Sequence, residues 1–388
     1  MSVGPFRVSD SDFTALARGG GGASAVRTLR LARRSRTLLL IRSIAAEPAA
    51  REAFALLCEV ARVAPGAVDR VLDHPSVGAW ATRTALALRR GDAEVRPAEL
   101  AFTAAAAAVR AGVPVDLRFP PVDVFSLPSL GVVEGPGLAY RPLPEIDVGG
   151  LSLQVDLWAG GGVPDELPVA ASVDLPRWRD AVGSAWDLLS GDHPASAAEV
   201  AEVVSVLTPM PSSPSGTSSA TLADAFGCVF LSPMPDAETL AVTLVHEAQH
   251  SKLVALMDLF ALVKPGREAL FYAPWREDPR PAAGLLHGTY AHLGVAGFWR
   301  SRPGPAAQVE YARWRSAALI TAEALLAGDE LTPTGTRFVA ELAGVLRAWC
   351  AEPLPPAALA VAEAESSAHR ARWRAAHGPL PERGTRGS

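Results

Sequence analysis

The sequence feature that most constrains the fold is a long apolar segment that contains two histidines and a glutamate. It spans residues 242–257 and reads VTLVHEAQHSKLVALM, with His246, Glu247 and His250 in an HExxH pattern. Residues four apart lie on one face of an α-helix, so both imidazoles can bind the same divalent metal ion. Because the segment is apolar on nearly every side, we expect a central, buried helix. Its buried polar side chains then need partners.

Residues around this segment indicate where the helix begins and ends. Asp236 follows Pro235 as a candidate N-cap, and Glu238 would lie in the first turn. Pro265 and Gly266 are expected to end the helix. An HExxH pattern also arises by chance in unrelated helices, but here the helical and apolar context that a metal site requires is present.

Composition indicates a globular protein. The chain has 388 residues, 49% of them hydrophobic, which is enough for a sizeable core. A formal net charge of −5 gives no general attraction to nucleic acid or to an anionic membrane. The three cysteines lack CxxC spacing, which argues against a disulfide framework or a thiolate metal site. No signal peptide opens the chain, so we expect a cytoplasmic protein.

The pattern of apolar and turn-forming residues predicts a mainly α fold with a small β-sheet, an α+β class. Residues 1–120 form a predicted helical N-terminal region, residues 121–375 an α+β catalytic region that contains the HExxH segment, and residues 376–388 a disordered tail. A basic cluster in the first region is interpreted as a solvated helix face, and comprises Arg30, Arg33, Arg34 and Arg36.

Individual elements follow from periodicity and from proline and glycine positions. Helices are expected at about 25–46, 50–63, 67–90, 97–111, 177–189, 195–207, 282–299, 308–327, 333–350 and 355–374. Strands are expected at 122–125, 151–157, 169–173 and 226–231. A Pro/Ser/Gly-rich loop at 210–219 precedes the last strand. The edge of that strand could pair with an extended peptide, or the loop could be a surface connection only.

A second informative segment spans residues 271–300 and reads FYAPWREDPRPAAGLLHGTYAHLGVAGFWR. Its prolines stiffen a loop that carries Arg276 and Arg280, and an arginine fork binds a carboxylate through two hydrogen bonds. The alternative is that Asp278 pairs with the arginines and braces the loop.

The helix after this loop supplies candidates for a third metal ligand. His287 lies in a stripe of small residues on which another helix can approach closely, whereas His292 lies about 140° further round. We therefore prefer His287 as the ligand and interpret His292 as a packing residue. Glu310 and Glu323 remain alternatives, because a carboxylate would complete the two-histidine, one-carboxylate set of oxygen-activating iron sites.

Three segments together resemble a known family: LVHEAQHSKL, APWREDPRP and GLLHGTYAHLGV. They resemble the HExxH-motif peptide-modification proteins, which occur alone or fused to radical SAM maturases in gene clusters for ribosomally made peptides. The resemblance covers most of the chain and is strongest over residues 218–299. It implies an Fe(II)- and 2-oxoglutarate-dependent enzyme that hydroxylates a β-carbon in a precursor peptide.

The same resemblance implies roles for individual residues. His246 and His250 would bind iron, and Arg276 and Arg280 are candidates for the 2-oxoglutarate carboxylate. The third ligand is not assigned by it. Because the chain has no radical SAM cysteine motif, it would be a stand-alone member that acts on a peptide brought by another protein or by a leader sequence, with a radical SAM maturase as an expected partner.

Two other functions stay open. In a zinc metallopeptidase, the histidines would hold Zn²⁺ and Glu247 would take a proton from the metal-bound water that attacks a peptide bond. A non-catalytic peptide-binding protein with a degenerate site is the third possibility. It fits less well, because both histidines and the glutamate are intact.

Overall fold

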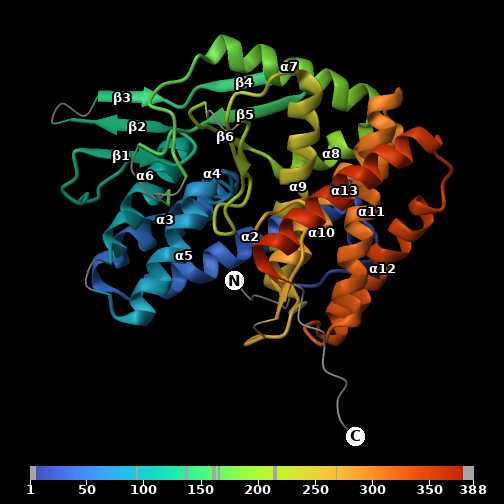
Figure 1. The fold of residues 1–388 in the computed structure, drawn as a ribbon. Helices are drawn as coiled ribbons and strands as arrows, with labels where there is room; N and C mark the ends of the chain where they lie inside the picture. Colours follow the sequence, from blue (N-terminus) through green and yellow to red (C-terminus); the bar gives the residue numbers. More distant parts are fainter. Residues whose placement is uncertain are drawn as a thin grey trace, which may run out of the picture. The chain divides into compact units, whose positions relative to one another are not determined.

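The computed structural model describes residues 6–92, 95–135, 139–159, 163–164, 167–212, 216–267 and 269–378. The chain forms two compact units. The first comprises residues 1–25, 190–196 and 248–388, and the second comprises residues 26–189 and 197–247. The boundary falls within helix α9 (Ala237–Leu259), the HExxH helix. The predicted class, mainly α with small β-sheets, is confirmed (Figure 1).

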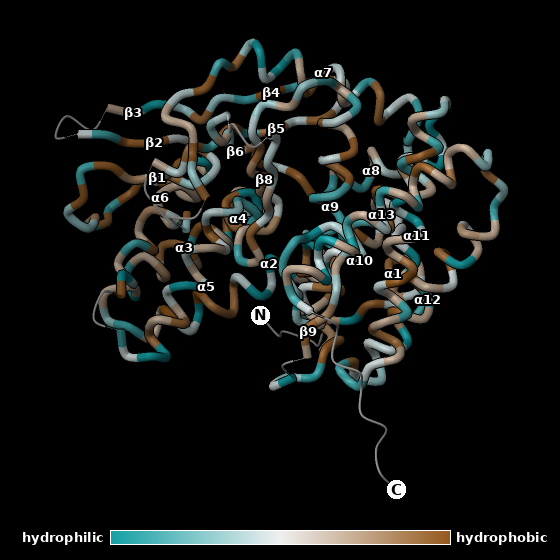
Figure 2. The backbone as a smooth tube through the Cα atoms, viewed as in Figure 1, coloured by the Kyte–Doolittle hydropathy of each residue, from teal (hydrophilic) through white to brown (hydrophobic). Residues whose placement is uncertain are grey.

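The second unit begins with the predicted helical region. Its helices are α2 (Gly22–Ile44), α3 (Arg51–Val63), α4 (Pro65–Leu72), α5 (Pro75–Arg90) and α6 (Leu100–Ala111). The single helix expected at 67–90 is divided into α4 and α5, because Pro75 starts a new helix. Apolar and hydrophilic residues alternate along α3 (Figure 2), which buries Ala53, Leu57 and Val60 in the core of this unit.

Two sheets follow in the same unit. The strands β1 (Val124–Leu127), β2 (Gly131–Glu134) and β3 (Ala139–Pro142) form an antiparallel sheet. A five-stranded sheet has the order β4-β5-β6-β8-β7, and consists of β4 (Glu145–Val148), β5 (Leu151–Val155), β6 (Val206–Pro209), β7 (Ser219–Ala220) and β8 (Cys228–Leu231). Its central strands β5, β6 and β8 are parallel, and both edge strands are antiparallel to their neighbours. The strands β6 and β8 are buried throughout.

Around this sheet, one predicted helix ends earlier than expected and one predicted strand is wrong. The helix expected at 195–207 ends at Val203 as α8 (Pro194–Val203), and Val206 and Leu207 begin β6 instead. The strand expected at 169–173 does not form, although Ala170 donates one hydrogen bond to the carbonyl of Pro209. The strand β6 already has β5 on one side and β8 on the other, so residues 169–173 cannot pair along β6 as a further strand.

The first unit is built from helices and one short hairpin. Its helices are α1 (Asp10–Ala17), α10 (Ala282–Ser301), α11 (Pro305–Ala327), α12 (Pro333–Cys350) and α13 (Pro356–His377). The strands β9 (Leu270–Phe271) and β10 (Arg280–Pro281) pair antiparallel and enclose the proline-rich loop. Most of the predicted tail at 376–388 lies outside the described residues. None of the described helices combines the length and apolar character that a membrane span requires.

Candidate metal centre

Helix α9 presents the HExxH residues, and its start is confirmed at the predicted cap. The backbone N–H of Thr239 donates to Oδ1 of Asp236 at 2.7 Å. The helix ends at Leu259, several residues before Pro265 and Gly266, which were expected to end it. The chain leaves the helix there because Val263 pairs with Leu331 in a β-bridge.

The predicted burial of α9 is also confirmed for its apolar residues. Leu240, Leu244, Leu253 and Leu256 are at most 1% exposed. His246 and His250 are half-buried, one helical turn apart. These two histidines therefore lie on the part of the helix surface that other residues leave partly uncovered.

Glu247 is the most enclosed polar residue of the motif, with 2% of its surface exposed. Ser219 donates a hydrogen bond of 2.7 Å to its Oε1, while no hydrogen-bond partner reaches Oε2 among the described residues. Burial raises the pKa of Glu247 to about 7, and the hydroxyl groups of Ser219 and Thr221 partly oppose this rise. The Nε2 atom of His246 lies 4.0 Å from Oε1.

The first unit brings His287 of α10 to His250 of α9. Their ring centroids are 5.8 Å apart and their planes differ by 34°. Two imidazoles that bind one ion at about 2.1 Å have centroids roughly 5 Å apart, so the observed separation is close to that of a metal-bound pair. Burial lowers the pKa of His287 to about 4, which keeps this imidazole in the neutral, metal-binding form at neutral pH.

Across the described ranges, no three His, Cys, Asp or Glu side chains stand close enough together to form a ready metal site. The donor set nevertheless suits a borderline divalent ion, because imidazole binds Fe(II) and Zn²⁺ well. Helix geometry places His246 one turn before His250, and the ring contact places His287 beside His250. The role of His287 as the third ligand stays a prediction.

His292 lies in different surroundings, which agree with its interpretation as a packing residue. Its ring stacks on Trp275 at 4.2 Å and contacts Trp314 at 4.5 Å between centroids, and its Nδ1 lies 2.8 Å from the carbonyl oxygen of Gly288. Gly288 is needed here, because a Cβ atom would lie 2.4 Å from the Trp275 ring. The indole of Trp275 therefore packs the proline-rich loop against α10 at Gly288, the residue after His287.

The two alternative carboxylate ligands have other contacts. Glu310 accepts a hydrogen bond of 2.7 Å from the indole N–H of Trp314. Glu323 pairs with Arg347 at 3.3 Å and is half-exposed.

The proline-rich loop is braced by Asp278, as one of the two sequence interpretations holds. Arg276 donates to its carboxylate at 2.9 Å and Arg280 at 3.1 Å, and both hydrogen bonds lower the pKa of Asp278. The guanidinium of Arg280 also packs against Gly284 of α10. A Cβ atom added at Gly284 would lie only 3.2 Å from Nε of Arg280. Gly284 precedes His287 by about one turn of α10. The structure thus brings one arginine of the loop to the helix that carries the candidate third ligand.

Sequence reasoning missed three residues that support the HExxH helix. Ser219 was part of a loop noted only for its composition, and its contact with Glu247 follows from the fold. Gln249 lies within the motif and Lys252 follows it on α9, and both donate to the carbonyl oxygen of Gly19. Lys252 could have been noticed in the sequence, because a lysine within an apolar helix is unusual. The structure buries this side chain fully.

A scan of the chain against protein-family models finds no match, and a comparison with curated proteins finds none either. The family resemblance described above therefore depends on the three quoted segments alone.

Proposed function

We propose that the chain is an Fe(II)- and 2-oxoglutarate-dependent dioxygenase that β-hydroxylates a residue of a ribosomally synthesised precursor peptide. The observation that carries this proposal is the ring contact of His287 with His250, one turn after His246. Three neutral imidazoles would hold the ion, and bound Fe(II) with 2-oxoglutarate would supply the oxidation of a C–H bond by O₂.

The loop arginines support the choice of an oxygenase. A 2-oxoglutarate-dependent enzyme needs a cation for the distal carboxylate of the cosubstrate, and an arginine fork suits that group. Arg280 meets this need best, because its guanidinium lies on α10 about one turn from His287. Its pair with Asp278 is partly solvent-exposed and therefore weak, so a bound carboxylate can replace Asp278 there.

The edge strand β7 supports a peptide substrate. The backbone N–H of Ser232 donates to the carbonyl of Ser218, and the register then puts Ser219 at a non-hydrogen-bonded position opposite Leu231. The main-chain N–H and C=O of Ser219 consequently point away from β8, where an extended peptide can add as a further strand. Since Ser219 also contacts Glu247, a peptide in this position would pass beside the motif.

A cytoplasmic location with a separate radical SAM maturase as partner completes the proposal. Cys58, Cys228 and Cys350 are free thiols, which suits a reducing compartment.

A zinc metallopeptidase is the second candidate, and one observation favours it. The Oε2 atom of Glu247 is buried without a hydrogen-bond partner among the described residues, and the pKa of this carboxyl is raised to about 7. Such a group is suited to accept a proton from a metal-bound water.

Metal and cosubstrate assays distinguish the two candidates. The protein is purified without oxygen, loaded with Fe(II), and given 2-oxoglutarate and a candidate precursor peptide. We expect about one bound Fe(II) per chain, release of succinate, and a peptide heavier by one oxygen atom. Peptide cleavage with Zn²⁺ and no requirement for O₂ would establish the peptidase. Failure to bind either metal would contradict both.

A further inference from the structure

The second unit contains an arginine-lined cavity of about 350 Å³ that includes no residue of the HExxH motif. Five arginines line it, from helices α2, α4 and α6: Arg30, Arg33, Arg34, Arg70 and Arg110. The interpretation of the α2 cluster as a solvated face is wrong for Arg33, which is only 6% exposed and donates to the carbonyl of Ala223.

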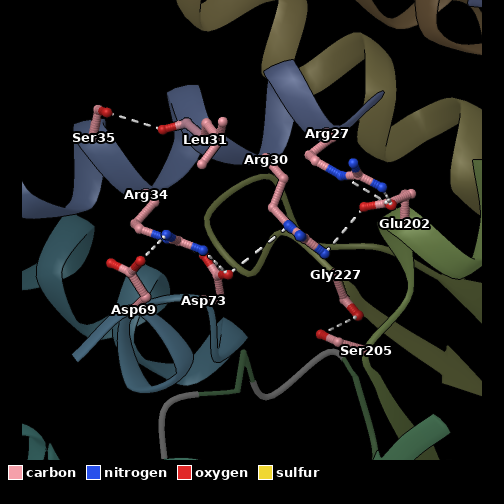
Figure 3. Close-up of polar contacts among 10 residues, drawn as sticks. All are labelled: Arg27, Arg30, Leu31, Arg34, Ser35, Asp69, Asp73, Glu202, Ser205 and Gly227. Atoms are coloured by element: carbon pink, nitrogen blue, oxygen red, sulfur yellow. Dashed lines mark hydrogen bonds and ion pairs between the residues drawn. The ribbon is translucent and has the colours of Figure 1, made fainter. Parts of the chain in front are cut away.

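Carboxylates pair with Arg30 and Arg34 on the α2 side of the cavity (Figure 3). Arg34 pairs with Asp69 at 2.6 Å and also with Asp73. Arg30 pairs with Glu202 at 3.2 Å and lies 3.9 Å from Asp73. These carboxylates are therefore already engaged and leave no negative charge for the arginines on α4 and α6.

The arginines on α4 and α6 have no such partners. Arg110 donates from Nε to Oγ of Ser129 at 2.8 Å and from a terminal nitrogen to the Ser129 carbonyl, so both acceptors are neutral. Arg70 is exposed, and no hydrogen bond or ion pair joins it to another residue in the described part of the chain. Burial lowers the pKa of Arg110, and the nearby charge of Arg70 lowers it further.

One carboxylate faces this pair of arginines. Glu145 also lines the cavity, and it raises the pKa of Arg110. It is exposed and accepts a hydrogen bond of 3.1 Å from Gln154. One carboxylate against two guanidiniums leaves an excess of positive charge at this end of the cavity.

A buried histidine lines the same cavity. His74 is 4% exposed, and its Nδ1 lies 2.8 Å from the hydroxyl of Ser76. Its Nε2 has no hydrogen-bond partner among the described residues, and the nearest carboxylate oxygen, Oδ2 of Asp156, is 3.9 Å away. When the Ser76 hydroxyl donates to Nδ1, Nε2 carries the proton and can donate to a ligand.

We propose that this cavity binds an oxyanion, either a carboxylate of an acidic peptide side chain or a phosphate group, between Arg70 and Arg110. Guanidinium groups recognise both anions through paired hydrogen bonds, and Ser129 already holds Arg110 in one orientation. An oxyanion would also relieve the repulsion between the two arginines. The volume lies at the lower end of the range of about 300–1,000 Å³ that is usual for ligand sites.

The test measures binding of two probes to the full chain by titration calorimetry at constant ionic strength. The first probe is inorganic phosphate, and the second is a triglutamate peptide with both ends blocked. We expect at least one probe to bind the unaltered chain, and Arg70→Gln to weaken that binding at least about tenfold. Arg89→Gln, at an exposed position on α5 outside the cavity, is the matched control and is expected to change nothing.

Each outcome has a defined meaning. Binding of phosphate alone identifies a phosphate site, and binding of the peptide alone identifies an acidic-peptide site. Arg110→Gln is the second variant and should also weaken binding. Because it removes the hydrogen bonds to Ser129 as well, thermal unfolding checks that the variant is folded. Equal affinities in Arg70→Gln and Arg89→Gln, or no binding of either probe to the unaltered chain, would overturn the proposal.

Discussion

Ser219 of the edge strand β7 donates a hydrogen bond of 2.7 Å to Oε1 of Glu247 in the HExxH helix. The carboxyl group is almost fully buried, and this hydrogen bond stabilises its charged form against the effect of burial. Protonation of Glu247 is therefore coupled to folding of the second unit.

The first prediction concerns the pH dependence of stability in the metal-free protein. Burial raises the pKa of Glu247 from an ordinary value of 4.5 to about 7. Between these two values the unfolded chain has released the proton and the folded chain retains it, so the free energy of unfolding falls as pH rises. Relative to Glu247→Gln, the unaltered chain should lose about 3 kcal/mol across this window.

Urea unfolding with a chelator present, at pH values below, within and above the window, measures this difference. Glu59→Gln, at an exposed position on α3, is the control and should follow the unaltered chain. If Glu247→Gln and the unaltered chain show parallel pH profiles, the raised pKa is wrong. Ser219→Ala should extend the fall in stability to higher pH, because the lost hydrogen bond to the carboxylate raises the pKa of Glu247 in the folded chain only.

The second prediction separates His287 from His292 as the third metal ligand. His250→Ala and His287→Ala should each weaken Fe(II) or Zn²⁺ binding by about a hundredfold or more. His292→Ala should keep the metal but lower the melting temperature, because it empties the space between Trp275 and Trp314.

Metal content after dialysis and thermal unfolding provide the two measurements. His377→Ala, at the exposed end of α13 where Nε2 lies 2.6 Å from the carbonyl oxygen of Glu277, is the control for metal content and should keep the metal. Retention of metal in His287→Ala together with its loss in His292→Ala would reverse the assignment.

The third prediction concerns the arginine loop and depends on the proposed oxygenase. Arg280→Ala should keep the metal and raise the KM for 2-oxoglutarate at least about tenfold, because the fork for the distal carboxylate is lost. Arg276→Ala should have a smaller effect, since only Arg280 lies against Gly284. Succinate release at varied 2-oxoglutarate concentrations measures both values. An unchanged requirement in both variants would remove the loop from the mechanism.

Local sequence signals were enough to predict most helices. The cap at Asp236, the start of α10 after Pro281 and the end of α6 near Gly112 follow from side chains or backbone preferences within a few positions of the boundary. The early end of α9 did not follow, because Val263 pairs with Leu331, which is distant in the sequence.

The sheet and the site were less predictable, because they also depend on contacts between residues that are distant in the sequence. The pairing of β6 between β5 and β8 decides that residues 206–209 form a strand, although the preceding residues form a helix. In the site, helical spacing predicts that His246 and His250 share a face, and the fold brings His287 to His250. The contact between Ser219 and Glu247 needed a strand that the sequence did not reveal.

The fourth prediction tests how the proline-rich loop is attached to α10. In Gly288→Ala the new Cβ would lie 2.4 Å from the Trp275 ring, so the indole must move off the helix. We expect a loss of about 1–3 kcal/mol in stability and a change in tryptophan fluorescence. Gly344→Ala is the matched control on α12, where a Cβ meets nothing within 4 Å. The control should gain up to about 1 kcal/mol from helix propensity, and a similar gain in Gly288→Ala would contradict the close packing.

The last prediction concerns the only two lysines of the chain, Lys252 and Lys264. Lys252 is fully buried on α9, where its Nζ donates to the carbonyl oxygens of Gly19 at 2.9 Å and Gly20 at 3.2 Å. Lys264 is partly exposed and pairs with Asp329 at 2.7 Å. Brief treatment of the native protein with an amine-reactive reagent should therefore modify Lys264 and spare Lys252, as mass spectrometry of the digested chain will show.

Substitution gives an independent measurement of the same difference. Lys252→Met leaves the Gly20 carbonyl without this donor, while Gly19 keeps a hydrogen bond from Gln249, so the expected loss is about 1–3 kcal/mol. Lys264→Met removes only an exposed ion pair and should change stability by less than about 1 kcal/mol. Rapid modification of Lys252 in the native protein, or equal stabilities of the two variants, would mean that the Gly19–Gly20 turn is not held by α9.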